Sequence, residues 1–351
     1  KETRNIVMAN YSNDFSIENL EVIRRYQSNE DNVFFAYSEF SYNTLVGAYE
    51  PFLDIICNMH RRFIGGSFDD FQKECGVYYL HRQVLNSYYE TGECFREETV
   101  LLNEVAYEQR RMTMAIADML KKLSEVKPLM IVINRFQMAS KSSIETIKYL
   151  IDNPCANIGI VLGVNAIVKG TDSTVEVWDR IVESLEDRSA IYYIGSAGPL
   201  KNNVKTTNDD ELYITMNFEQ SIQEASNIME FLDFEQARRG CRIIEHKLKF
   251  EDAWIDEKSL RRFYMVYART SVLLGEMSKA IELTNEYKAL IPENDSEHYL
   301  SLYYFMKGTC YMYQGKLEKA GNSAKSAYDY AVLAEDDTLI FLSLIHISEP
   351  T

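Results

Sequence analysis

The chain has 351 residues, of which 46% are apolar and 26% charged, and this composition excludes collagen-like, mucin-like and wholly disordered proteins. Its 37 Lys and Arg against 53 Asp and Glu give a net charge of -16, which would repel a nucleic-acid backbone unless a separate basic face existed. No apolar run in the sequence reaches the ~18 to 20 residues that span a bilayer. We therefore expect a cytoplasmic protein of two domains, with no direct nucleic-acid binding and no membrane partner.

Strands and helices alternate along the first 217 residues. Short, continuous apolar runs predict strands at 4–8, 32–37, 129–133, 158–162 and 190–194. Apolar residues at helical spacing predict helices at 16–27, 48–63, 97–126 and 143–151. This alternation predicts a mainly parallel sheet covered by helices on both faces, with a ligand site at the carboxyl ends of its strands.

The residues after the strand at 129–133 carry the clearest motif. The run Pro128-Leu-Met-Ile-Val-Ile-Asn-Arg-Phe-Gln-Met-Ala-Ser140 resembles the second nucleotide motif of STAND-type P-loop ATPases. These are signalling proteins that couple an ATPase module to tetratricopeptide repeats. In that family the strand ends in two acids, followed by an aliphatic residue, Gln, Trp, Ala and Asp. Here Asn134 and Arg135 replace the acids, while Gln137 and Ala139 keep the pattern.

The resemblance implies a phosphate-binding loop after the first strand, where residues 9–16 read Ala-Asn-Tyr-Ser-Asn-Asp-Phe-Ser. Against the pattern G-x-x-x-x-G-K-[ST], Asp14 replaces the second Gly, Phe15 replaces the Lys, and only Ser16 is retained. Asp14 adds a negative charge and lacks glycine's access to positive φ, and Phe15 removes the cation that would pair with the phosphates. The alternative of an intact loop upstream is disfavoured, because 5–37 already supplies a complete strand, loop, helix and strand.

The resemblance thus implies a degenerate nucleotide site, formed by Ser12, Asn13, Ser16, Asn134 and Arg135. We expect this site to hold no metal and to bind ATP or ADP weakly or not at all. We also expect no catalytic residue, because the six cysteines and five histidines are dispersed and the sequence lacks H-E-x-x-H and G-x-S-x-G motifs.

From residue 218 onward the sequence predicts helices only, arranged in repeats. Three units align on a small residue, a turn residue seven positions later and an Ala five positions after that: Ala225, Leu232, Ala237; Ala268, Gly275, Ala280; Gly308, Gly315, Ala320. The spacing of 40 residues from Ala268 to Gly308 exceeds the usual 34 of tetratricopeptide repeats. In this register a bulky side chain at Gly315 or Ala320 should overpack the paired helices.

The pattern resembles the elongated tetratricopeptide-like repeats attached to bacterial ATP-binding regulators, and a generic helical bundle is the alternative. The resemblance implies a protein or peptide partner for the helical region.

The last ten residues, 342–351, match the translation of a transposase mosaic-end sequencing adapter, so we expect them not to be native and the chain to be a fragment. The expected architecture is an α/β P-loop-like parallel-sheet domain, a degenerate STAND/AAA-like ATPase domain, over 1–217. An all-α tetratricopeptide-like repeat domain follows over 218–341.

The function expected from these features is the sensory and scaffolding portion of a bacterial signal-transduction regulator. In this hypothesis a pseudo-ATPase module is coupled to a protein-binding helical repeat array, and the chain is not an enzyme. One alternative is an active ATP-dependent STAND switch that regulates a missing C-terminal output domain, either a DNA-binding helix-turn-helix or a diguanylate cyclase. A further alternative is a plain repeat adaptor without a ligand.

Overall fold

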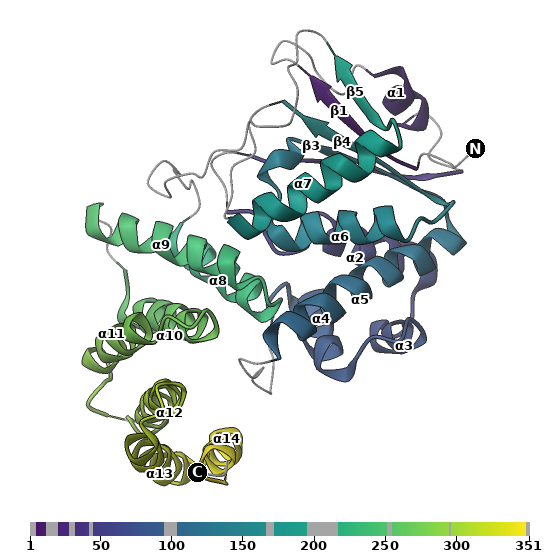
Figure 1. The fold of residues 1–351 in the computed structure, drawn as a ribbon. Coiled ribbons are helices and arrows are strands. Elements are labelled where there is room, and N and C mark those ends of the chain that lie inside the picture. Colours follow the sequence, from purple (N-terminus) through teal and green to yellow (C-terminus); the bar gives the residue numbers. More distant parts are fainter. Residues whose placement is uncertain are drawn as a thin grey trace. The chain divides into compact units, whose positions relative to one another are not determined.

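The computed structural model describes residues 5–11, 20–27, 32–41, 45–94, 104–165, 172–194, 217–250, 255–294 and 296–348. The chain divides into two compact units, which Figure 1 traces by sequence colour. The first unit is α/β and includes the short segment Glu230–Asp233, whereas the second consists of helices.

Five parallel strands form the sheet of the first unit, in the order β2-β3-β4-β1-β5. Their bounds are Ile6–Tyr11 for β1, Phe34–Glu39 for β2, Leu129–Asn134 for β3, Ile158–Val164 for β4 and Ile191–Ile194 for β5. The middle strand β3 is buried at every position, as its continuous apolar run predicts for a parallel sheet. The predicted parallel sheet is confirmed.

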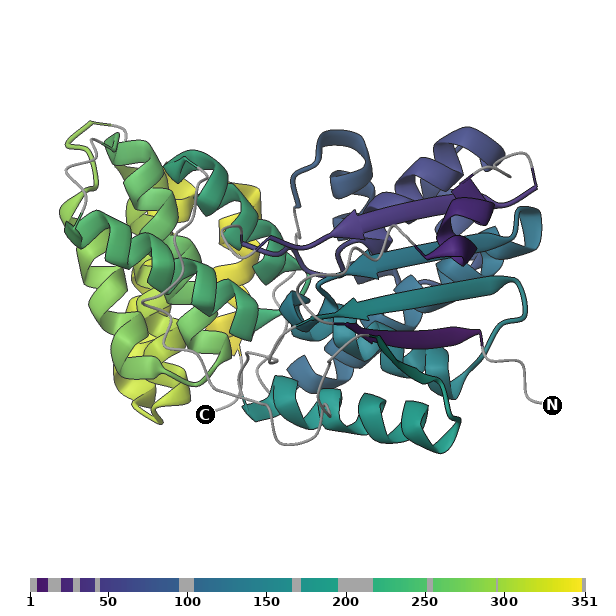
Figure 2. The same cartoon turned by 90° about the horizontal axis from the view of Figure 1, so that it is seen from above.

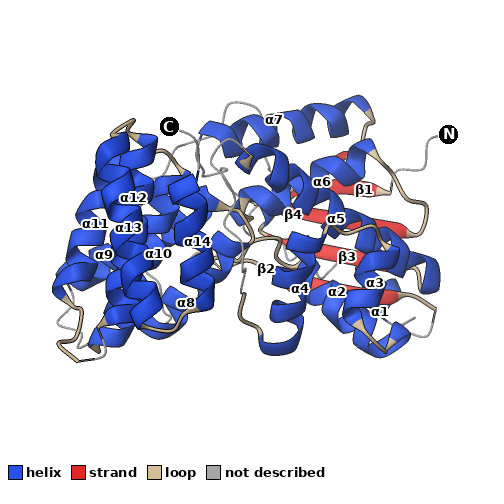
Figure 3. Ribbon diagram, turned by 90° about the horizontal axis from the view of Figure 1, so that it is seen from below, coloured by secondary structure: helices blue, strands red, loops and turns tan. Residues whose placement is uncertain are grey.

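Most helices of the first unit lie on one face of the sheet, where Figure 3 shows α2, α3, α5 and α6 in front of the strands. The elements here are α2 Phe52–Met59, the π-helical turn His60–Ile64, α3 Phe68–Glu74, α4 Tyr79–Thr91, α5 Val105–Val126, α6 Lys141–Asp152 and α7 Asp172–Asp187. Because β2, β3, β4 and β5 follow one another in the same direction across the sheet, right-handed crossovers bring their connecting helices to the same face.

The opposite face carries a single helix among the described residues, the seven-residue α1, Glu21–Gln27. The step from β1 to β2 runs the other way across the sheet, so its crossover lies on this side, as Figure 2 shows. Ile23 of α1 is fully buried against Ala9, Tyr11 and Val132. The expected full helical cover of both faces is therefore not found in the described part of the chain, since α1 is too short to reach across all the strands.

The second unit is a run of paired helices with a regular period. Its helices are α8 Phe218–Glu230, α9 Phe234–Phe250, α10 Glu257–Leu273, α11 Met277–Ala289, α12 Glu297–Tyr313, α13 Leu317–Leu333 and α14 Asp337–Ser348. The helices α10, α12 and α14 begin at 257, 297 and 337, so the predicted 40-residue spacing recurs once more than the sequence alignment indicated. Within this unit α10 packs against α11, and α13 packs against both α12 and α14.

The turns within the pairs lie at the positions that the sequence alignment predicts, and their backbones are alike. Leu232, Gly275 and Gly315, the aligned turn residues, have φ values of 68°, 78° and 71°. The hydrogen bonds at the two glycine turns also match, because Gly275 N donates to Val272 O at 2.9 Å and Gly315 N donates to Met312 O at 2.9 Å. These left-handed turns end one helix and reverse the chain into the next.

Of the two glycines aligned in the α12 and α13 pair, Gly308 lies close to α13 and Gly315 does not. A Cβ at Gly308 would lie 3.4 Å from Ser323 Cβ and 3.5 Å from Ala320 O, whereas one at Gly315 would meet nothing within 4 Å. The predicted overpacking at Gly315 is thus wrong. Glycine is favoured at that turn by its positive φ.

Three cysteine thiols are buried inside helices, namely Cys57 of α2, Cys241 of α9 and Cys310 of α12. Burial raises the pKa of Cys57 and of Cys310 from an ordinary 9.0 to about 11, and it raises the pKa of Cys241 as well. These thiols are therefore protonated at neutral pH, which makes them poor nucleophiles.

Candidate functional site

The strand order places a candidate site at the carboxyl ends of β1, β4 and β3. The connection from β1 to β2 crosses one face of the sheet, and the connection from β4 to β5 crosses the opposite face. The direction of winding therefore reverses between the neighbouring strands β1 and β4. Ligands of open α/β sheets bind beyond the carboxyl ends of strands at such a point. Here β1 ends at Tyr11, β3 ends at Asn134, and Asn165 follows β4.

Asn134 is held by hydrogen bonds from three directions. Its Oδ1 accepts from the Tyr11 hydroxyl and from the Arg135 backbone N–H, the latter at 3.0 Å. Its Nδ2 donates to the Tyr37 hydroxyl at 3.3 Å. An amide oxygen has two lone pairs, and both are used here. The side chain is also buried, with the residue 8% exposed, so its oxygen is not available to a metal ion.

Arg135 lies beside Asn134 with an unusual backbone. Its φ of 55° is in the left-handed region, which residues other than Gly seldom adopt and which clusters at functional sites. Its Nη2 pairs with Glu39 Oε1 at 3.0 Å, and its Nη1 donates to Phe40 O at 3.4 Å. The side chains of Arg135 and Glu39 are each about one-third exposed, 35% and 36% respectively, so this ion pair faces solvent.

These contacts join into one network across three strands. The Tyr37 hydroxyl accepts from Asn134 and donates to Glu39 Oε2 at 3.2 Å. The network therefore runs from Tyr11 of β1 through Asn134 of β3 to Tyr37 and Glu39 of β2, and it ends on Arg135. It is a fixed polar arrangement with one cation and one anion at the solvent side.

Gln137 extends the polar edge toward β4. It is almost fully buried, and its Nε2 donates to Asn165 Oδ1 at 2.7 Å, which ties the segment after β3 to the residue after β4. Ser140 is the N-cap of α6, and its hydroxyl accepts from Ser143 N at 3.4 Å. The Asp233 carboxylate accepts from Ser142 N at 3.0 Å in the same turn of α6. The N-terminus of α6, the positive end of the helix dipole, is thus already occupied by the Asp233 carboxylate.

Of the residues that the sequence proposes for a nucleotide site, Asn134 and Arg135 lie side by side at the carboxyl edge. Ser12, Asn13 and Ser16 lie outside the described residues, as do Asp14 and Phe15. The sequence did not single out Tyr11, Tyr37 or Glu39. A partial signal existed, since Tyr37 was read as the last residue of a strand and Glu39 follows two positions later, on the same face of that strand.

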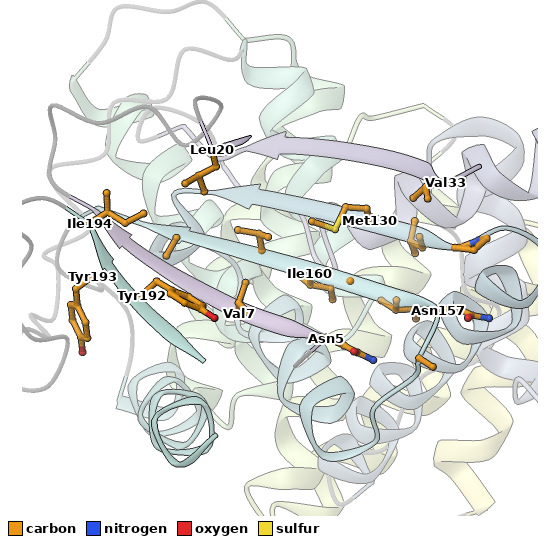
Figure 4. A pocket seen from close by; sticks show the side chains of 17 residues that line it. Asn5, Val7, Leu20, Val33, Met130, Asn157, Ile160, Tyr192, Tyr193 and Ile194 are labelled. Carbon is orange, nitrogen blue, oxygen red and sulfur yellow. The ribbon is translucent and has the colours of Figure 1, made fainter. Parts of the chain in front are cut away.

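A groove of about 710 Å³ lies elsewhere, on the sheet face that bears α1. Figure 4 shows Val7, Met130 and Tyr192 along it, while Tyr193 points away. Its described lining residues include no Lys, Arg, Asp or Glu. Uncharged side chains do not neutralise a phosphate, so the polar edge with Arg135 is the better candidate for an anionic ligand among the described residues.

Within the described parts of the chain, His, Cys, Asp and Glu side chains nowhere gather in a group of three or more that could hold a metal ion. Across those same ranges, every helix is too short or too polar to cross a membrane.

Comparison with family models, with curated proteins and with solved structures gives no match.

The network predicts a measurable role for the Tyr11 hydroxyl. Tyr11→Phe should lower the free energy of unfolding by about 1 to 2 kcal/mol, because Tyr11 is 3% exposed and Asn134 loses a buried donor that water cannot replace. Urea denaturation followed by circular dichroism measures this change. Tyr37→Phe, in the half-buried part of the same network, is the comparison, and we expect a smaller loss because water can take over its contacts. Equal losses in the two variants would contradict the greater contribution of the buried Tyr11 hydroxyl.

Proposed function

We propose that the chain is the sensory and scaffolding portion of a bacterial signal-transduction regulator, with a pseudo-ATPase module joined to a protein-binding helical repeat array. The observation that carries the proposal is that Asn134, at the position where the resembled ATPases have an acid, is a neutral residue with a fully hydrogen-bonded oxygen. Its oxygen accepts two hydrogen bonds, and the next residue is a cation. The proposed module is a STAND-like fold that retains the site's position but not its chemistry.

The arrangement of the strands supports the assignment of β1 and β3 to the two nucleotide motifs. The strands are separated by β4 alone, and the hydrogen bond from Tyr11 to Asn134 joins their carboxyl ends. A ligand that bound after β1 would therefore also face Asn134 and Arg135. This is the relation that the two motifs of a P-loop site require.

Hydrolysis at such a site needs a loop Lys, a Mg²⁺ ion held by a hydroxyl and an acid, and a residue that orients water. Phe15 stands in the sequence where the Lys belongs. Asn134 is neutral and its oxygen is already used, while the Arg135 charge opposes a second cation nearby. These features together support a module that does not turn over ATP.

The helical unit supports the scaffolding part of the proposal. Stacked repeats present an extended surface, and proteins built in this way commonly use it to bind other proteins. The regular 40-residue period and the matching turns at Gly275 and Gly315 are features of such a stack. The proposed partner is therefore a protein or peptide.

The test is titration calorimetry with ATP, with and without Mg²⁺, combined with a phosphate-release assay. We expect no binding that depends on Mg²⁺ and no release of phosphate, because the Asn134 oxygen is already used and the described residues contain no group of three or more potential metal ligands. Magnesium-dependent micromolar binding with turnover that Ser16→Ala abolishes would overturn the proposal. That result would favour the alternative of an active ATP-dependent switch.

A further inference from the structure

We propose that Glu39 is an internal competitor for a metal-free phosphate site on Arg135, so that a polyphosphate group binds this edge only by displacing the Glu39 carboxylate. The inference rests on the proposed pseudo-ATPase function, and it adds a means by which the same site is regulated. The ligand is defined by its chemistry as a chain of phosphates, either free or attached to a nucleoside.

The backbone around Arg135 fixes the direction of the cation. Arg135 N donates to Asn134 Oδ1 at 3.0 Å, and Arg135 O accepts from Met138 N at 2.9 Å. These bonds hold the left-handed conformation, with φ 55°, at the carboxyl end of β3. A non-glycine residue kept in this conformation next to an expected ligand position is a reason to look for a binding role.

The Glu39 carboxylate is an anionic partner of this cation, whose Nη1 also donates to Phe40 O at 3.4 Å. It lies 3.0 Å from Arg135 Nη2, and both side chains are partly open to solvent. Ion pairs as exposed as this one contribute little to stability, so a ligand can break it at low cost. A phosphate is a stronger partner than a carboxylate, because it carries more charge and matches the two-pronged guanidinium with two oxygens.

The binding would not use a metal ion. The Asn134 oxygen is already filled by Tyr11 and by the Arg135 amide, so it cannot act as a metal ligand. The Arg135 guanidinium would stabilise the phosphate charge in place of the divalent cation of a functional nucleotide site, although it carries one positive charge where that ion carries two. The expected affinity is therefore low, and the nearby Glu39 charge lowers it further by repelling the incoming anion.

The experiment measures binding in EDTA by titration calorimetry, with ATP and with inorganic tripolyphosphate as separate probes. Glu39→Gln removes the competing charge but keeps an oxygen that can accept from Tyr37. We expect this variant to bind both probes about five- to tenfold more tightly than the unmodified chain, the change that follows from removing one like charge at close range. A gain with ATP alone would also support the proposal and would identify the ligand as a nucleotide.

Two further variants make the comparison specific. Glu176→Gln is the control, because Glu176 forms an ion pair with Arg180 on α7 whose side chains are more exposed than those of Glu39 and Arg135, and we expect it to change nothing. Adding Arg135→Ala to Glu39→Gln should abolish the gain. Equal affinities in Glu39→Gln and the unmodified chain, absence of binding by Glu39→Gln, or a gain that survives the loss of Arg135 would each overturn the proposal.

The outcome can be separated from the test of the proposed function. Magnesium-dependent turnover would refute the pseudo-ATPase while leaving the comparison in EDTA interpretable. Conversely, a failure of Glu39→Gln to gain affinity would refute the competition while leaving the absence of turnover intact. Glu39→Ala, checked by its thermal melt, repeats the comparison if the Gln variant does not fold.

Discussion

Phe231→Ala is expected to lower the free energy of unfolding of the first unit by about 3 to 5 kcal/mol, the usual cost of emptying the site of a buried Phe. Phe231 is 2% exposed and belongs to the segment Glu230–Asp233 of that unit. Its ring packs edge-to-face against Tyr49 at 6.1 Å and Tyr88 at 5.5 Å between centroids. Chemical denaturation with circular dichroism measures the loss.

The segment has other fixed contacts, so the cavity cannot easily close around the missing ring. Gln109 Nε2 donates to Leu232 O at 2.6 Å, and Asp233 accepts from Ser142 N at 3.0 Å. Tyr193→Ala serves as the control, because Tyr193 is 48% exposed on β5 and should cost no more than about 0.5 kcal/mol. If Phe231→Ala were no more harmful than this control, Phe231 would not be part of the core of the first unit.

Gly308→Leu is expected to destabilise the helical unit by about 2 kcal/mol or more, because the site between α12 and α13 has room for little beyond a Cβ. Gly308→Ala places its methyl group at ordinary contact distance, 3.4 Å from Ser323 Cβ, and gains helix propensity, so we expect a change near zero. Thermal melts of the two variants measure the difference.

Gly315→Ala completes the series, because it tests the backbone rather than the packing. The site is open, but its φ of 71° is costly for any residue with a Cβ, and we expect a loss of about 1 kcal/mol. The order of stability should therefore be Gly308→Ala, then Gly315→Ala, then Gly308→Leu. A Gly308→Leu variant as stable as Gly308→Ala would show that α12 and α13 do not approach each other at this residue.

The parts of the fold that could be predicted from the sequence are those whose patterns are local. β3 is apolar throughout, which predicts a buried parallel strand, and the turn glycines recur at a fixed distance from a small residue. Helix α7 was not predicted, although Trp178, Ile181 and Leu185 lie at helical spacing and are buried. Helices α3 and α4 were not predicted either, because buried polar residues such as Gln72 and His81 interrupt the apolar pattern.

The site depends on long-range neighbours, which the sequence does not reveal. Asn134 was found because it follows a recognisable strand. The contact of Tyr11 with Asn134 requires β1 and β3 to lie on either side of β4, and the contact of Arg135 with Glu39 requires β2 next to β3. A linear pattern contains no information on that order. The competing carboxylate on Arg135 could therefore be identified only from the assembled sheet.

The labelling rates of two buried thiols can report how the helical unit opens. Cys241 in α9 and Cys310 in α12 are both 0% exposed and belong to different helix pairs. A thiol reagent can reach each sulfur only after its own pair has separated, so the two labelling rates report two local opening equilibria in the folded chain. Mass spectrometry of the labelled peptides would then show whether the helix pairs open one by one or together, without any introduced probe.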